Sequence, residues 1–168
     1  LINCVGLTSV EQCEANPTKA YYLNAKVPSI LAKTCFEQKV SFIHISTDHL
    51  FDGLIGFRSE SDIPSPLNQY AYTKLKGDKN VIYNNPDSLI IRTNFFGLGP
   101  NYRSSFSDII IKALENKQTI KLFTDVFFTP IHVNELADIV FELLKNKEKG
   151  IYNIASDERI SKYEFGVM

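Results

Sequence analysis

Short apolar runs alternate along the chain with longer segments of helical periodicity. The runs at 1–5, 40–45 and 88–92 predict strands, and the first and third are apolar enough for burial on both faces of a sheet. Apolar positions at near-helical spacing predict helices over 18–38 and 69–83, with Pro28 expected to kink or divide the first helix. This order predicts an α/β fold with a Rossmann-like, doubly wound parallel sheet.

The pattern of apolar and polar residues changes after Gly97. A loop is expected at Gly99, Pro100 and Asn101, followed by helices over 106–115 and 134–145 and strands at 119–123 and 150–155. Ser161 and Glu164 have the spacing of a capping box, which predicts one more helix. We therefore expect 1–97 to be the C-terminal part of a dinucleotide-binding core, and 98–168 to combine the remaining core elements with part of a smaller substrate-binding region.

The composition of the chain reduces the number of functional classes to consider. The 168 residues carry a formal net charge of −1, so no basic excess points to nucleic acid, and the longest apolar runs are too short to cross a membrane. The three cysteines, Cys4, Cys13 and Cys35, are irregularly spaced, which favours reduced thiols in a cytoplasmic protein. No cluster has metal-ligand spacing, so we expect no metal.

Candidate chemistry lies where the strand at 40–45 ends. Ser46, Thr47 and Asp48 follow that strand, Tyr70 comes 23 positions after Thr47, and Lys74 is one helical turn beyond Tyr70. A lysine ammonium beside a phenol would lower the pKa of the tyrosine and suit it to proton transfer. Thr47 could hydrogen-bond a carbonyl oxygen that is being reduced by hydride from a cofactor.

A Tyr-x-x-x-Lys pattern is weak evidence when it stands alone. The chain has eight tyrosines, and Tyr72 with Lys76 forms a second pair of the same spacing. Either pair could also be an ordinary part of a solvated helix surface. From the residues alone, the order of strand end, helical pair and following strand favours a catalytic role without choosing between the two pairs.

Four segments of the chain, 2–6, 44–53, 65–74 and 91–97, resemble the dTDP-4-dehydrorhamnose reductase family of extended short-chain dehydrogenases/reductases. They include the sequences Ser-Thr-Asp-His-Leu-Phe-Asp-Gly and Tyr-Ala-Tyr-Thr-Lys, and they occur in the family's order over nearly the whole chain. The resemblance implies Thr47, Tyr70 and Lys74 as the catalytic residues, and so it selects Tyr70 over Tyr72.

The resemblance also implies a reductase that uses NADP or NAD and acts on a nucleotide-sugar in dTDP-rhamnose biosynthesis. It assigns the cofactor to Cys4, Val5, Gly6, Ser46, Tyr70, Lys74 and Asn94, and the substrate to Thr47, Asp48 and Phe95. Relatives usually have Ala-Ala at Cys4 and Val5, and often Tyr at His49. Asn24 matches a family asparagine in the helix behind the active site, although a helix-surface or capping role is equally open. A homodimer is compatible with the resemblance.

Three alternatives and one missing part accompany this interpretation. An epimerase or a dehydratase could share the fold, and so could a non-catalytic regulatory subunit like the reductase-like subunit of methionine adenosyltransferase. The intact catalytic set favours an enzyme. No glycine-rich phosphate loop precedes Leu1, so we expect a preceding N-terminal βαβ region that supplies it.

Overall fold

The structure is a computed structural model that describes residues 1–100 and 104–168, so Asn101 of the expected loop lies outside the described residues. The chain forms two compact units. The first contains residues 1–93 and 144–153, and the second contains residues 94–143 and 154–168. Each unit is described by itself.

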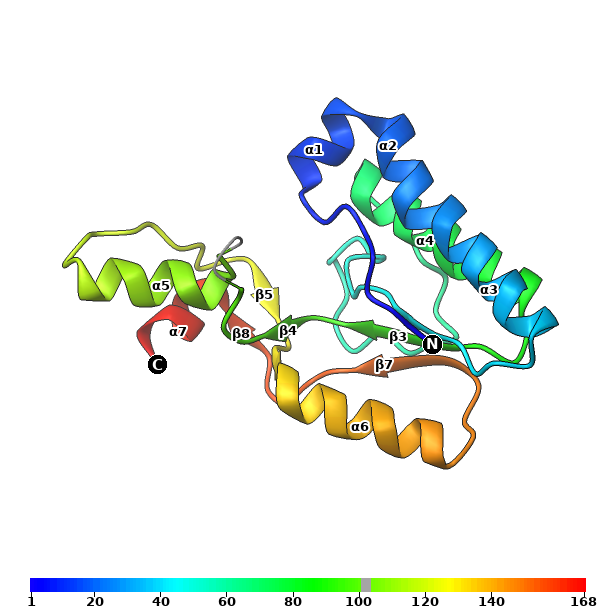
Figure 1. The fold of residues 1–168 in the computed structure, drawn as a ribbon. Coiled ribbons are helices and arrows are strands. Elements are labelled where there is room, and N and C mark those ends of the chain that lie inside the picture. Colours follow the sequence, from blue (N-terminus) through cyan, green and yellow to red (C-terminus); the bar gives the residue numbers. More distant parts are fainter. Residues whose placement is uncertain (101–103) are drawn as a thin grey trace. The chain divides into compact units, whose positions relative to one another are not determined.

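A four-stranded sheet forms the centre of the first unit (Figure 1). Its order is β1 (Ile2–Asn3), β2 (Ile43–Ile45), β3 (Leu89–Thr93) and β7 (Gly150–Ile154). The pairs β1/β2 and β2/β3 are parallel, with Ile43 opposite both Ile2 and Leu89. The predicted α/β class with a parallel, Rossmann-like sheet is therefore confirmed.

Strand burial follows the prediction for β3 and is partial for β1. Every residue of β3 is buried, as its continuous apolar run indicated. The strand expected over 1–5 is reduced to Ile2 and Asn3, and the side chains of Ile2 and Val5 are 40% and 52% exposed. Among the described residues β1 pairs with β2 alone, and Ile2 is exposed while Asn3 is buried. Burial of both faces with the help of the expected N-terminal region stays a prediction.

The helices of the first unit are α1 (Val10–Ala15), α2 (Pro17–Tyr21), the π-helix η1 (Tyr22–Lys26), α3 (Val27–Glu37) and α4 (Gln69–Asn84). Pro28 lies in the first turn of α3, where a backbone N–H is not needed for the helix. The helical run expected over 18–38 is continuous from Pro17 to Glu37, with a π-helical turn before the proline, so the expectation that Pro28 divides it is wrong. Helix α4 packs along both η1 and α3 (Figure 1).

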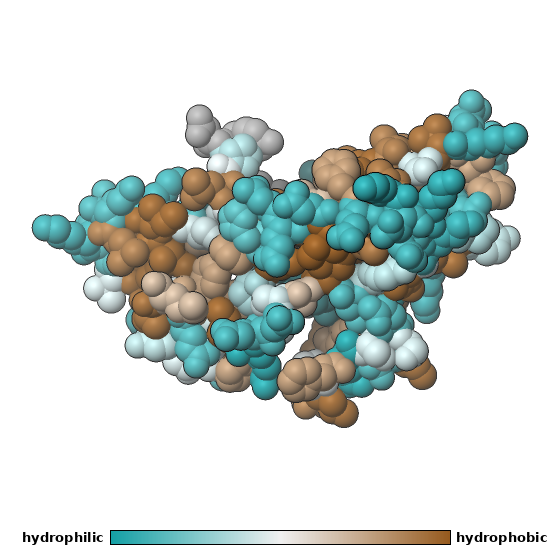
Figure 2. Space-filling model, turned by 90° about the horizontal axis from the view of Figure 1, so that it is seen from below, coloured by the Kyte–Doolittle hydropathy of each residue, from teal (hydrophilic) through white to brown (hydrophobic). Residues whose placement is uncertain are grey.

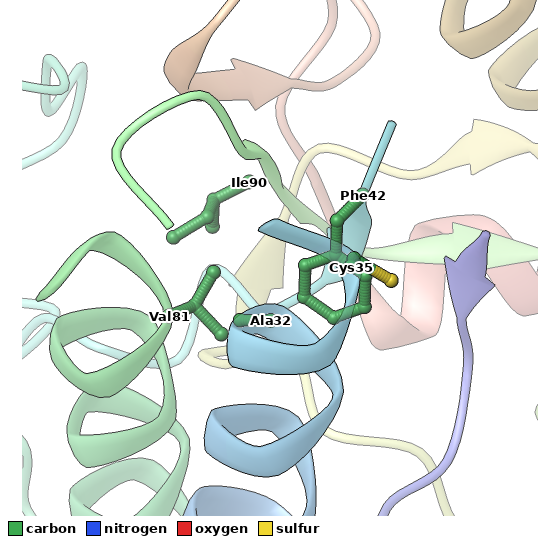
Figure 3. Close-up of a cluster of buried hydrophobic side chains, with 5 residues drawn as sticks. All are labelled: Ala32, Cys35, Phe42, Val81 and Ile90. Carbon is green, nitrogen blue, oxygen red and sulfur yellow. The ribbon is translucent and has the colours of Figure 1, made fainter. Parts of the chain in front are cut away.

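The apolar core of the first unit lies between α3, α4 and the sheet. Figure 3 shows its buried members, Ala32 and Cys35 from α3, Val81 from α4, Phe42 just before β2, and Ile90 from β3. Burial of such side chains contributes roughly 25 cal/mol for each Å² of apolar surface removed from water. This cluster therefore holds the C-terminal half of α4 firmly against the sheet.

The second unit consists of short strands and three helices. Its elements are β4 (Phe95–Phe96), α5 (Phe106–Glu115), β5 (Phe127–Phe128), β6 (Ile131–His132), α6 (Val133–Lys145), β8 (Ile160–Ser161) and α7 (Lys162–Val167). Strands β4 and β6 are parallel, and β5 and β8 are antiparallel. The predicted capping box of Ser161 and Glu164 is confirmed at the start of α7.

The strand expected at 119–123 is wrong. Residues 119–123 have no strand assignment, and the carbonyl oxygen of Phe123 accepts a hydrogen bond from the backbone N–H of Tyr163 in α7. Leu122 packs closely against Gly166 of the same helix. Leu122 of this segment therefore packs on α7, and the segment does not join a sheet.

Large apolar side chains remain exposed between the hydrophilic ones, as the mixture of colours in Figure 2 shows. Phe57 and Tyr83 in the first unit and Leu114 and Phe141 in the second are examples. Single exposed residues of this kind are common on folded proteins. Within the described residues no helix is long and apolar enough to span a membrane.

Gly77 permits the close contact between α4 and η1. A Cβ atom at this position would fall well inside the van der Waals distance of the Asn24 carbonyl oxygen, which is backbone and cannot rotate away. We expect Gly77→Ala to lower the free energy of unfolding of the full-length protein by about 1–3 kcal/mol. Urea denaturation measures this change. Gly56→Ala is the matched control, because nothing lies within 4 Å of a Cβ there, and an equal loss in both variants would contradict the explanation.

Candidate active site

The end of β2 positions Ser46 and Thr47 at the carboxyl edge of the sheet. The backbone N–H of Ser46 donates to the Ile91 carbonyl at 2.6 Å, which continues the ladder with β3 one residue past the strand. Both side chains are buried. The N–H of His49 donates to Thr47 Oγ1 at 3.2 Å, so the hydroxyl is held by the turn that follows it.

Helix α4 brings the tyrosine and the lysine to the same edge. The Asn68 side chain accepts a hydrogen bond from the Ala71 N–H at 2.8 Å and caps the helix. This cap places Tyr70 in the first turn and Lys74 one turn later, on the same face of the helix. Both are buried at 9% and 4% exposure, which is unusual for a lysine.

The side chains of Tyr70 and Thr47 lie near enough to influence each other. Burial raises the pKa of Tyr70, the neighbouring Thr47 hydroxyl opposes this increase, and the negative charge of Asp48 adds to it. The expectation that Lys74 would lower the pKa of Tyr70 is therefore wrong here, because the loss of water around the phenol is the largest effect. At neutral pH Tyr70 is a neutral phenol and can donate its proton.

Lys74 is directed toward the sheet. Its Nζ donates to the carbonyl oxygen of Ile45, the last residue of β2, at 2.7 Å. Burial lowers the pKa of Lys74 to about 8, although the negative charges of Asp78 and, when it is ionised, Cys4 favour the ammonium form. An ammonium has three N–H donors, of which Ile45 takes one.

The structure separates the two Tyr-x-x-x-Lys pairs. Tyr72 is 44% exposed, and the Lys76 ammonium lies 5.5 Å from the centroid of its ring in a surface cation–π contact. Tyr72 is two residues from Tyr70 and so faces a different side of α4. Tyr70 and Lys74 are the pair that the fold brings to Thr47 and Ile45.

The run after β1 is open to a ligand. Cys4 and Val5 are exposed, Gly6 has no side chain, and the Val5 N–H is held at 3.2 Å by the Asn3 side chain. A negative charge on Cys4 would favour the ammonium form of Lys74. An exposed segment that follows a strand at the carboxyl edge of the sheet fits a polar ligand such as a dinucleotide.

Asp48 and His49 adjoin the hydroxyl pair. Thr47 Oγ1 donates to Asp48 Oδ1 at 3.4 Å, and His49 Nε2 lies 3.8 Å from the same oxygen. The His49 ring approaches Tyr70 edge-on, with 6.0 Å between the centroids. The histidine that replaces the usual tyrosine therefore contacts both the carboxylate and the phenol.

Asn94 and Phe95 belong to the second unit, and their expected roles stay predictions. The Asn94 carbonyl oxygen accepts from the Ile131 N–H at 3.2 Å, and Phe95 is half exposed on β4. Within this unit a hollow of about 270 Å³ is lined by residues that include Phe96, His132 and Phe165. The His132 ring packs edge-on against Phe96.

Sequence reasoning left Asn24 undecided, and the structure gives it a precise role. Its buried side chain accepts from the Leu7 N–H at 2.7 Å and donates to the Leu7 carbonyl at 2.9 Å and to Thr73 Oγ1 at 3.0 Å. Asn24 thus ties the loop after β1 to α4 between Tyr70 and Lys74. The residue was visible as a polar position in a buried helix, but its partners are distant in sequence.

Asp78 and Arg92 were missed altogether. Arg92 Nε donates to Asp78 Oδ2 at 3.0 Å, and both side chains are almost fully buried beneath Lys74. Two signals could have found them: an acidic residue one turn after Lys74, and a charged residue in an otherwise apolar strand. Among residues 1–100 and 104–168, no group of three or more His, Cys, Asp or Glu side chains could hold a metal ion.

Comparison with known proteins agrees with this geometry. The family model described as the RmlD substrate binding domain matches residues 1–168. The chain is 36% identical to a probable low-salt glycan biosynthesis reductase, Agl14, from Haloferax volcanii, and the match covers 99% of this chain and 57% of that protein. It is also 30% identical to methionine adenosyltransferase 2 subunit beta from Xenopus laevis, covering 98% of this chain and 51% of that protein.

Solved structures share the fold over the whole chain. The structure of dTDP-4-dehydrorhamnose reductase from Bacillus anthracis in complex with NADP superimposes with a TM-score of 0.92 at 26% identity, covering 99% of this chain and 59% of that chain. The chain therefore spans somewhat more than half the length of the proteins that it matches.

The Asn24 side chain gives a prediction about the scaffold of the site. Asn24→Ala would leave the Leu7 backbone groups without these partners, so we expect a loss of about 2–4 kcal/mol in the free energy of unfolding of the full-length protein. Urea denaturation measures the loss. Asn84→Ala is the control, because Asn84 makes two side-chain hydrogen bonds at a partly exposed position of α4. Equal losses in the two variants would show that the buried hydrogen bonds of Asn24 contribute no more stability than those of the partly exposed Asn84.

Proposed function

The chain belongs to the family of the RmlD substrate binding domain, and from this premise we propose that it forms the catalytic part of an NAD(P)H-dependent sugar-nucleotide reductase. The observation that carries the proposal is the buried arrangement of Tyr70 next to Thr47, with the Lys74 ammonium one helical turn away. A neutral phenol, a hydroxyl and a cation at the carboxyl edge of a parallel sheet are the groups that carbonyl reduction requires.

The catalytic residues act on the carbonyl oxygen of the substrate. NADPH or NADH, held at this edge of the sheet, would supply the hydride that is added to the carbonyl carbon. Tyr70 donates its phenolic proton to the oxygen, and the product is an alcohol. Thr47 holds the same oxygen by a hydrogen bond and orients Tyr70, whose pKa is raised by burial so that the proton is present at neutral pH.

Lys74 has a holding role in this mechanism. Its Nζ is fixed by the Ile45 carbonyl at 2.7 Å, and we assign its two further N–H groups to the ribose hydroxyls of the cofactor. The exposed backbone of Cys4, Val5 and Gly6 would line the same cofactor, together with Ser46 and Asn94. The cysteine and valine are larger than the alanines usual in relatives, and both leave the backbone exposed at this edge.

We propose a 4-keto sugar nucleotide such as dTDP-4-dehydrorhamnose as the substrate. The resemblance of the segments around Thr47 and Tyr70 supports this choice, as does the similarity to the Bacillus anthracis dTDP-4-dehydrorhamnose reductase. Asp48 and Phe95 are the further residues that we assign to the sugar. A cytoplasmic location and a homodimer remain predictions of the same proposal.

A regulatory subunit is the second candidate function. It is favoured by one observation, the 30% identity with methionine adenosyltransferase 2 subunit beta. A regulatory subunit would bind the nucleotide without turnover. Reduction of a 4-keto sugar nucleotide by the purified full-length protein, followed by the decrease of reduced nicotinamide absorbance, distinguishes the two functions. An epimerase or a dehydratase would convert the sugar without net consumption of the cofactor.

Two tyrosine variants test the catalytic assignment. We expect Tyr70→Phe to reduce kcat by about 10² to 10⁴, because it removes the proton donor and keeps the ring. Tyr72→Phe is the matched control, since it lies on the same helix in an exposed contact with Lys76, and it should retain the wild-type rate. Steady-state kinetics of the full-length protein measure both. Wild-type turnover by Tyr70→Phe would show that another group donates the proton.

The pH dependence of the rate tests the role of Lys74. The pKa of Lys74 lies at about 8, and above it the neutral amine lacks the charge and one donor that hold the cofactor. We therefore expect kcat/KM to be constant below this pH and to fall above about pH 8. Lys76→Met, on the exposed face of α4, should leave this alkaline decrease in place. A profile that stays flat well above pH 8 would contradict the assignment.

A further inference from the structure

A cluster of polar side chains is buried beneath Lys74, and the proposed mechanism does not use it. Its four members come from different elements: Asn3 from β1, His44 from β2, Asp78 from α4 and Arg92 from β3. Their exposures are 3%, 0%, 2% and 4%. Three neighbouring strands and the catalytic helix thus contribute polar groups to one water-excluded site.

The members of the cluster contact one another in a chain. Arg92 Nε donates to Asp78 Oδ2 at 3.0 Å, and His44 Nε2 lies 3.9 Å from Asp78 Oδ1. The Asn3 side-chain nitrogen is 3.0 Å from His44 Nδ1. When the asparagine is the donor, the imidazole proton resides on Nε2, which makes no hydrogen bond in the structure. Arg92 is therefore the group that directly pairs with Asp78, and His44 lies nearby.

Stability alone does not account for this arrangement. Taking two charges out of water is costly, and apolar residues of similar size can replace a buried ion pair with little or no loss of stability. The same region of the first unit already has an apolar cluster built from Val81, Phe42 and Ile90. The pair of Asp78 and Arg92 is thus better explained by the charge that it places next to the site.

That charge acts on Lys74. Asp78 is four residues after Lys74, so the two side chains share a face of α4. Lys74 is itself 4% exposed and receives little help from solvent in keeping its proton. We propose that Asp78 is a positioning residue that holds Lys74 in its protonated form against the Ile45 carbonyl, with Arg92 fixing the carboxylate. The inference rests on the function proposed for Lys74.

The other titratable groups around Lys74 do not replace Asp78. Burial and the charge of Lys74 lower the pKa of His44 well below its usual range, so the imidazole is neutral. Tyr70 is neutral at the same pH, and Arg92 is positive, so neither supplies a negative charge. The Cys4 thiol favours the ammonium only when it is ionised. Asp78 is the carboxylate that raises the pKa of Lys74. Burial raises the pKa of Asp78 itself, while the positive charges of Arg92 and Lys74 favour its ionised form.

The ionisation of Lys74 can be observed directly. In the full-length protein with labelled lysines, the NMR signal of the Lys74 side chain reports its protonation as pH is varied. We expect the wild-type midpoint at about 8. Asp78→Asn should lower the midpoint by about one unit or more, as loss of a nearby opposite charge does. Asp78→Glu, which retains the negative charge, should have a Lys74 midpoint close to that of the wild type.

Val81→Ala is the matched control. Val81 is fully buried on the same helix, three residues after Asp78, and carries no charge (Figure 3). This variant should lose stability and leave the Lys74 midpoint unchanged. A merely structural role of Asp78 predicts instead that both variants behave alike.

A second variant keeps the test decisive if Asp78→Asn does not fold, because that change leaves Arg92 buried without its carboxylate partner. Asp78→Leu combined with Arg92→Met replaces the whole pair by apolar side chains. Proteins often tolerate such a replacement of a buried ion pair without loss of stability. We expect this double variant to fold and to show the lowered Lys74 midpoint. An unchanged midpoint in either folded variant would overturn the inference.

The alkaline decrease of kcat/KM separates this inference from the proposed function. If the wild type is a reductase, the alkaline decrease of kcat/KM should occur at lower pH in Asp78→Asn and near the wild-type pH in Asp78→Glu. An active enzyme whose decrease does not move refutes the role of Asp78 and leaves the reductase function intact. A protein without reductase activity whose Lys74 midpoint still shifts refutes the function and supports the role of Asp78.

Discussion

Helix α4 lies against η1 and the sheet so closely that Gly77 has no room for a side chain, and the candidate site depends on this contact. Because the helix is pressed onto the carboxyl edge of the sheet, Lys74 reaches the Ile45 carbonyl at 2.7 Å and Tyr70 reaches Thr47. Asn24, on the opposite side of the contact, holds the loop after β1 by hydrogen bonds to Leu7. One packing constraint therefore aligns three separate parts of the chain.

Burial at this edge changes the chemistry of each group in a different direction. It raises the pKa of the Tyr70 phenol and lowers the pKa of the Lys74 ammonium, because a low-dielectric environment disfavours the charged form of both. The first effect keeps a proton available for donation. The second effect favours loss of a proton from Lys74, and the negative charge of Asp78 opposes that loss. Burial therefore keeps the proton on Tyr70, and it also makes a nearby anion necessary to keep the proton on Lys74.

The second unit is built by different means. Its strands are two residues long and pair in two small sheets, while aromatic rings such as Phe96, Phe128 and Phe165 pack against one another. Segment 119–123 has the apolar pattern of a strand, yet its Leu122 packs on α7 and its Phe123 carbonyl accepts a hydrogen bond from that helix. The packing of this unit therefore relies on aromatic contacts and a helix, and not on an extended sheet.

The sequence by itself determined the parallel α/β class, the limits of helices such as 106–115, and the order of Thr47, Tyr70 and Lys74, because these depend on local periodicity and short motifs. Tertiary structure alone decided the direction of the Tyr70 pKa shift, since it depends on what surrounds the phenol. It also brought together Asp78 with Arg92 and Asn24 with Leu7. Those contacts join residues 14 and 17 positions apart, on elements whose relative placement no local pattern encodes.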